Sequence, residues 1–168
     1  MNIFVLSDSP QESAELHCDK HVCKMMIEYA QMLSTAHRVL DGDGVISESL
    51  YKVAHKNHPC TIWTRTNKSN YLWLFRLWKN LSMEYTLRYG RFHASWTKLN
   101  MYLEFPPKNI SEGDLIEQPQ CMPDHCKDEE DVVEAYRNYY IKEKSSFAKW
   151  KFASTPDWFE DGVKHANV

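Results

Sequence analysis

Hydrophobic and polar residues alternate at helical spacing through the first quarter of the chain. Between Pro10 and Leu40 no internal proline or glycine breaks the pattern, and the breaker DGDG follows it. Ser9 is placed to cap this segment, Pro10 suits a first helical position, and Glu12 stands three residues after the cap. The pattern predicts one long helix from Pro10 to about Leu40, with a bend or an interruption expected near the histidines.

The rest of the chain shows the same period less regularly. We predict helices at about 67–89, closed by Gly90, and at about 129–150, with shorter pieces at 47–54 and 92–102. NIFVL reads as a short strand, and residues 104–126 hold four prolines and no period. These elements predict a mainly α, single-domain helical bundle over residues 1–168, with a short N-terminal strand and a long proline-containing loop. An isolated strand also suggests pairing across a homodimer.

Composition restricts the function classes. The 168 residues are 43% hydrophobic, with five glycines and a net charge of −3, which is typical of a folded domain without an overall basic surface. A nucleic-acid partner would therefore need a local basic patch. No apolar run approaches a membrane span and no export signal precedes the five cysteines, so we expect a cytoplasmic protein with reduced thiols and no membrane partner.

The long first helix carries two distinct faces. At 100° per residue its apolar face consists of Val22, Met26, Tyr29, Leu33, Ala36 and Leu40. The opposite stripe consists of His17, Lys20, His21, Lys24, Glu28, Gln31, Thr35 and Arg38. This stripe is either a solvated face or one wall of a pocket for an anionic ligand. In a pocket, Lys20, Lys24 and Arg38 would meet phosphate or carboxylate, and Gln31 and Thr35 would give directional hydrogen bonds.

The second helix and the loop HKNHP extend the pocket hypothesis. Asn70 and Arg88 lie inside an otherwise apolar stripe, so Arg88 needs a carboxylate partner, for which Glu28 is a candidate, or a ligand. Further candidate ligand contacts are Asn57, His58, Trp63 and Tyr71, the two aromatic residues as stacking surfaces. The alternative assigns the aromatic residues to the core.

Histidines and cysteines raise the question of a metal. HCDKH lacks the glutamate of a metalloprotease helix, and the chain has no paired CxxC knuckles. We therefore predict no metal and no cofactor, and neutral histidines that bind a ligand or the fold. If the protein is a catalyst, His21, His58 and Glu28 are the candidates for general acid or base.

Two family resemblances rest on particular motifs. HCDKHVCKMMIEYAQMLSTAHR, YKVAHKNHPCTIWTRTNKSNYLWL and EYTLRYGRFH resemble a family of small proteins encoded by tailed bacteriophages. AELHC, the basic helix and FAKWK are also similar to the pyrimidine-dimer DNA glycosylases of T-even phages. This second resemblance implies a small helical enzyme that flips a nucleotide and cuts its glycosidic bond.

The glycosylase resemblance also implies an N-terminal amine as nucleophile and a glutamate within Arg-Glu-x-x-Arg. In this chain Met1 before Asn2 should be retained, and the comparable stretch, residues 20–24, contains no acid. Asp19 or Glu28 would have to take the glutamate's role in a rearranged site.

Two main functions therefore stand at this point. The first is a phage accessory protein that holds a nucleotide-derived, phosphate-bearing molecule and sequesters or processes a host defence signalling nucleotide. The alternative is a DNA base-excision enzyme acting on a flipped nucleotide. A third class, a structural or partner-binding protein, would instead expose an apolar patch. The expected partner is thus a nucleotide-like small molecule or DNA.

Overall fold

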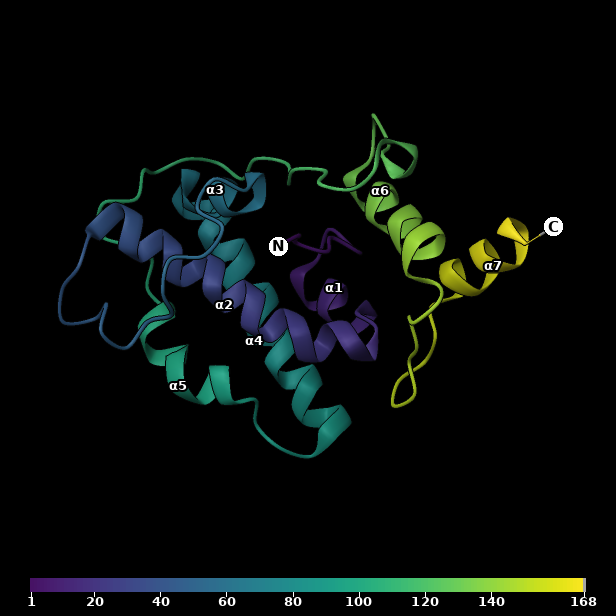
Figure 1. The fold of residues 1–168 in the computed structure, drawn as a ribbon, viewed down its shortest axis with the longest axis horizontal. Helices are drawn as coiled ribbons and strands as arrows, with labels where there is room; N and C mark the ends of the chain where they lie inside the picture. The colour runs from purple at the N-terminus through teal and green to yellow at the C-terminus, as the bar shows by residue number, and fades with distance from the viewer. Residues whose placement is uncertain (168) are drawn as a thin grey trace.

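The computed structural model describes residues 1–167 and is mainly α-helical, as predicted (Figure 1). Its elements are α1 (Pro10–Leu16), α2 (Asp19–Asp41), α3 (Pro59–Thr66), α4 (Lys68–Tyr89), α5 (Ala94–Leu103), η1 (Asp124–Cys126), α6 (Val132–Tyr139), the π-helical turn η2 (Tyr140–Lys144) and α7 (Asp157–Ala166). Helices α2 and α4 pack together at the centre, and α1, α3 and α5 pack around them. Figure 1 places the N-terminus inside the molecule and the C-terminus at the far end of α7.

The long helix predicted from Pro10 is interrupted at the histidine-rich stretch, as expected. His17 and Cys18 adopt extended backbone angles, so α1 ends at Leu16 and α2 begins at Asp19. The guanidinium of Arg88 donates to the carbonyl oxygens of Glu15 and His17, which the break leaves without helical partners. Arg88, a buried residue of α4, therefore joins α4 to the end of α1 at this break.

Helix α4 agrees with its prediction. Asn67 caps its start by accepting from the Asn70 amide, and Gly90 ends it in the left-handed region at φ +68°. Trp78 is fully buried, and its indole N–H donates to the carbonyl oxygen of Met26 in α2. The contact fixes the register of the two central helices.

The predicted N-terminal strand is wrong for the part of the chain that the structure describes. Residues 3–6 are buried, and side chains, not a partner strand, bind the backbone groups of Phe4 and Leu6. The Phe4 amide donates to Tyr29 Oη, the Leu6 amide donates to Ser13 Oγ, and Arg137 donates to the Leu6 carbonyl oxygen. Because residues 2–6 do not form a strand, the reason for expecting a homodimer through this segment disappears.

Two other element predictions need correction. Residues 47–54 are turns and extended chain, because the Arg38 guanidinium binds the carbonyl oxygens of Ser47, Leu50 and Tyr51. The helix expected over 129–150 starts at Val132 and gives way to the π-helical turn after Tyr139. Helices α3 and α7 were not predicted. The piece expected at 92–102 is present as α5.

The proline-containing segment 104–123 is the long irregular loop that was expected, and it crosses the molecule from α5 to η1 (Figure 1). The side chains of α3 and α4 hold it in place. Trp63 donates to the Ile116 carbonyl oxygen, and Asn70 accepts from the Ile116 amide. No helix within the described residues is long and apolar enough to cross a bilayer.

Candidate functional site

The N-terminal amine lies inside a cavity of about 280 Å³. The nitrogen of Met1 is 3.4 Å from Glu28 Oε2, and the Asn2 side chain donates to the Cys121 carbonyl oxygen at 2.8 Å. The cavity is lined by Met1, Asn2, Phe4, Lys20, His21, Lys24, Met25, Glu28, Cys121, Tyr139, Lys144 and Phe147. The first residues of the chain therefore meet α2, the long loop and the C-terminal third at one place.

Lysines and aromatic rings alternate around this cavity. Lys20 Nζ lies 4.4 Å from the centre of the Phe147 ring, and Lys144 Nζ lies 4.4 Å from the centre of the Tyr139 ring. Lys24 pairs with Glu28 at 3.5 Å. Three cations and the amine thus surround one carboxylate, which favours an anionic ligand that also has a flat apolar part.

His21 presents a neutral ring to the cavity. Its Nδ1 is 2.6 Å from Tyr140 Oη, which also accepts from the Cys18 amide. This geometry suits Tyr140 as the donor of its hydroxyl proton to Nδ1, a tautomer in which Nε2 carries the ring proton. Burial, and then the charges of His17 and the neighbouring lysines, lower the pKa of His21 to about 2. The ring stacks on Phe4 at 4.2 Å, so it offers an N–H donor held in a fixed plane.

A second buried histidine, His17, connects through hydrogen bonds to the N-terminal segment. The Phe4 amide donates to Tyr29 Oη, and Tyr29 donates to His17 Nε2 at 2.7 Å. His17 Nδ1–H then donates to the Ser13 carbonyl oxygen. Burial lowers the pKa of His17 to about 4, so the chain of bonds keeps its direction near neutral pH. This chain positions the first residues against α2.

Four of the residues that the sequence singled out line the cavity: Lys20, His21, Lys24 and Glu28. Others on the same stripe of α2 lie elsewhere. Thr35 exchanges hydrogen bonds with the backbone of Ala54, and Arg38 binds the carbonyls of the loop after α2. Gln31 is half-buried and does not line the cavity, because the polar stripe of α2 continues beyond the end of the cavity.

The candidates on α3 and α4 have partners within the fold. Asn70 donates to the Trp63 carbonyl oxygen, and Tyr71 donates to the Leu103 carbonyl oxygen. Arg88 pairs with Glu84 at 2.8 Å and Asp19 at 3.1 Å, and not with Glu28. These polar groups already have partners within the fold. We therefore leave Asn70, Tyr71 and Arg88, and also Thr35, Arg38 and Trp63, out of the proposed site.

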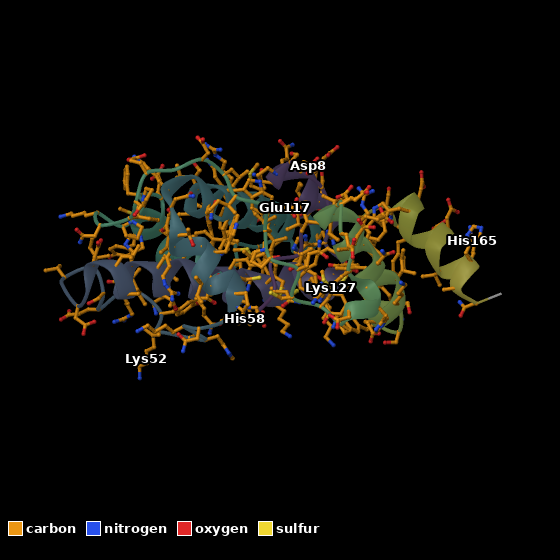
Figure 2. All side chains as sticks on the ribbon, turned by 90° about the horizontal axis from the view of Figure 1, so that it is seen from above. Asp8, Lys52, His58, Glu117, Lys127 and His165 are labelled. Carbon is orange, nitrogen blue, oxygen red and sulfur yellow. The ribbon has the colours of Figure 1, made fainter. Side chains whose placement is uncertain are left out.

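The HKNHP loop lies beside the cavity but does not line it. Asn57 is exposed, and His58 Nδ1 accepts from the Cys60 amide as the N-cap of α3. Partial burial, and next the charge of the Met1 amine, lower the pKa of His58. Figure 2 shows His58 on the same face as Lys52 and Lys127, with Asp8 and Glu117 toward the opposite face.

Sequence reasoning missed most of the cavity. Asn2, Phe4, Cys121, Tyr139, Lys144 and Phe147 come from segments far apart in the chain, and only the fold unites them. The available signal was the similarity to glycosylases, which pointed to the N-terminal amine and to FAKWK, residues 147–151.

Two groups of soft ligands in the described residues could hold a metal: His58, Cys60 and Cys121, and His125, Cys126 and Glu143. Cys60 donates to Cys121 Sγ at 3.7 Å. This bond lowers the pKa of Cys121 to about 7 and, with burial, raises the pKa of Cys60.

Comparison with known proteins gives one match. A family model described as pyrimidine dimer DNA glycosylase matches residues 1–98, more than half of the chain. No curated protein and no solved structure matches the chain. The matched region contains the Met1 amine and Glu28, whereas Tyr139, Lys144 and Phe147 lie outside it.

Proposed function

The chain belongs to the pyrimidine dimer DNA glycosylase family, and on that premise we propose that it excises a base from DNA with the Met1 amine as nucleophile. The observation that carries the proposal is the 3.4 Å separation of this amine from Glu28 Oε2 inside a cavity. Glu28 takes the role that the resemblance gives to a glutamate, one helical turn beyond the stretch 20–24 where the sequence comparison looked for it.

The proposed reaction needs a proton acceptor beside the amine. Glu28 accepts a proton from the ammonium of Met1, and the free lone pair attacks C1′ of a nucleotide turned into the cavity. The new C–N bond forms as the glycosidic bond breaks, and the base leaves with the bonding electrons and takes up the proton that the Met1 nitrogen, now bonded to C1′, gives up. Opening of the sugar, with Glu28 returning its proton to the ring oxygen, leaves an imine between Met1 and C1′.

The other cavity residues fit a flipped nucleotide. Lys20, Lys24 and Lys144 would neutralise the flanking phosphates, and the rings of Phe4 and Phe147 would cover a base. The neutral His21 would donate from Nε2 to an oxygen of the base or sugar. The net charge of −3 makes this local group of lysines the feature that draws DNA to this face.

The same lysines and rings support a second candidate, the binding of a free nucleotide-derived ligand. Such a protein would be stabilised by mononucleotides and would leave them unchanged. It would not need an amine paired with a carboxylate, which is why the excision proposal stands first.

Trapping of the imine tests the proposal. The protein, tagged at its C-terminus, is mixed with duplex DNA containing a pyrimidine dimer or an abasic site and reduced with borohydride. We expect a covalent protein–DNA adduct whose peptide map places the link on Met1. Intact mass establishes that Met1 is the first residue of the sample. A version extended by Gly-Ser before Met1 has an amide in place of the Met1 amine, and it should give no adduct at Met1 while still binding DNA. An adduct on a lysine, or none with either substrate, would overturn the proposal.

A further inference from the structure

We propose that His58, Cys60 and Cys121 form a binding site for a zinc ion. The proposal is independent of base excision. It rests on three soft ligand atoms that lie within 4.8 Å of one another and come from the start of α3 and from the long loop. A site of two thiolates and an imidazole favours zinc over harder divalent cations.

The separation of the two sulfurs fits a shared ion. In a tetrahedral site with Zn–S bonds of about 2.3 Å, two thiolate sulfurs stand about 3.8 Å apart. Cys60 Sγ and Cys121 Sγ are 3.7 Å apart. A disulfide needs about 2.05 Å, so forming one would require the sulfurs to approach by much more than binding a metal does.

The fold holds the ligands in place before any ion arrives. Cys60 is fully buried in the first turn of α3, two residues after the cap residue His58. The loop on the other side is fixed on both flanks of Cys121. Asn2 donates to the Cys121 carbonyl oxygen, and Tyr136 donates to the Pro119 carbonyl oxygen at 2.7 Å. An ion here would join the long loop to α3, and three protein ligands leave one tetrahedral position for water.

Binding would replace two hydrogen bonds, the one between the thiols of Cys60 and Cys121 and the helix cap. A neutral imidazole has one lone pair, and that of His58 now accepts from the Cys60 amide at 3.2 Å. The helix cap is thus exchanged for a metal–nitrogen bond. A cap is worth far less than a bond in a thiolate zinc site, so the exchange favours the ion. The second group, His125, Cys126 and Glu143, is mostly exposed and has one sulfur, which makes it the weaker candidate.

Metal content and cobalt spectra test the site without an activity assay. Protein reduced and stripped of metal should bind one Zn²⁺ per chain, and Co²⁺ should give thiolate charge-transfer bands of a tetrahedral site. Cys121→Ser and His58→Asn should each lower zinc affinity by more than about 100-fold. Asparagine is a good N-cap, so His58→Asn keeps α3 capped and removes only the ligand. Cys23→Ser, which changes a thiol outside the group, should bind zinc like the unchanged protein.

Three results would overturn the proposal. The first is reduced protein that takes up neither Zn²⁺ nor Co²⁺. The second is equal zinc affinity in His58→Asn, Cys121→Ser and the unchanged chain, with folding of each variant checked by circular dichroism. The third is a Cys60–Cys121 disulfide that, once reduced, leaves thiols without metal affinity.

Discussion

The amine of Met1 and the carboxylate of Glu28 face each other across 3.4 Å, one at the start of the chain and the other in the middle of α2. The side chain of Glu28 is only 18% exposed, and its other oxygen meets Lys24. A carboxylate held between two cations at the wall of a cavity is well placed to exchange a proton with one of them.

Replacing Glu28 by glutamine should slow base excision by about 10²–10⁴-fold, because an amide cannot accept the proton of the ammonium. Duplex affinity should be retained or should rise, since one negative charge leaves a positive site. Single-turnover cleavage and a binding titration measure the two effects. Glu117→Gln, at an exposed position in the long loop, is the matched control and should behave like the unchanged protein. Full activity in Glu28→Gln would remove this residue from the mechanism.

The lysines around the cavity should determine the salt dependence of DNA binding. Lys20→Ala and Lys144→Ala should each weaken binding at low salt and reduce the slope of log affinity against log salt by about 1, if each meets one phosphate. Lys79→Ala, on the exposed side of α4, should change neither quantity. The measurement is fluorescence anisotropy with a labelled duplex over a range of salt concentrations. Equal slopes for all four proteins would place DNA elsewhere.

Local chemistry explains which parts of the fold could be predicted from the sequence. Helix α4 has an asparagine cap and a terminal glycine at its two ends, and α1 has Ser9 and Pro10. Helix α3 starts with a histidine cap, an uncommon signal, and is only eight residues long. The segment NIFVL favours a strand by local preference, because Ile3 and Val5 are β-branched, but side chains distant in the sequence bind the amides of Phe4 and Leu6.

A smaller part of the candidate site could be predicted for a related reason. Lys20, His21, Lys24 and Glu28 share one face of a helix, so helical spacing alone places them together. Tyr139, Lys144 and Phe147 come close to these four residues only through long-range packing. No periodic pattern in the sequence reveals such contacts. Nothing in the spacing separated them from Thr35 or Arg38, whose bonds to backbone carbonyls depend on the path of the loop after α2.

Arg88 should be essential for stability. Its side chain is 1% exposed and joins Glu84, Asp19 and two carbonyl oxygens at the break between α1 and α2. Arg88→Ala takes the cation away from two largely covered carboxylates and the donor away from two carbonyl oxygens, and it should lower the free energy of unfolding by about 3–5 kcal/mol. Urea denaturation measures the loss, and the exposed Arg76→Ala should stay within about 0.5 kcal/mol of the unchanged protein. A stable Arg88→Ala protein that has lost ligand binding would instead support a ligand contact.

His17 should make the fold sensitive to acid. Burial lowers its pKa from 6.5 to about 4, so between these values the unfolded chain binds a proton that the folded chain does not. The stability linked to His17 is therefore fully present above pH 6.5 and is lost as the pH falls toward 4, by about 3 kcal/mol in total.

His17→Gln can still accept from Tyr29 but does not titrate. Its unfolding free energy, measured by urea denaturation from pH 7 to 4, should fall less steeply, by about 1.4 kcal/mol per pH unit within the window. The exposed His165→Gln serves as the control and should keep the original slope. Parallel curves for His17→Gln and the unchanged protein would mean that His17 takes up its proton at the same pH in the folded and the unfolded chain, which contradicts a pKa lowered by burial.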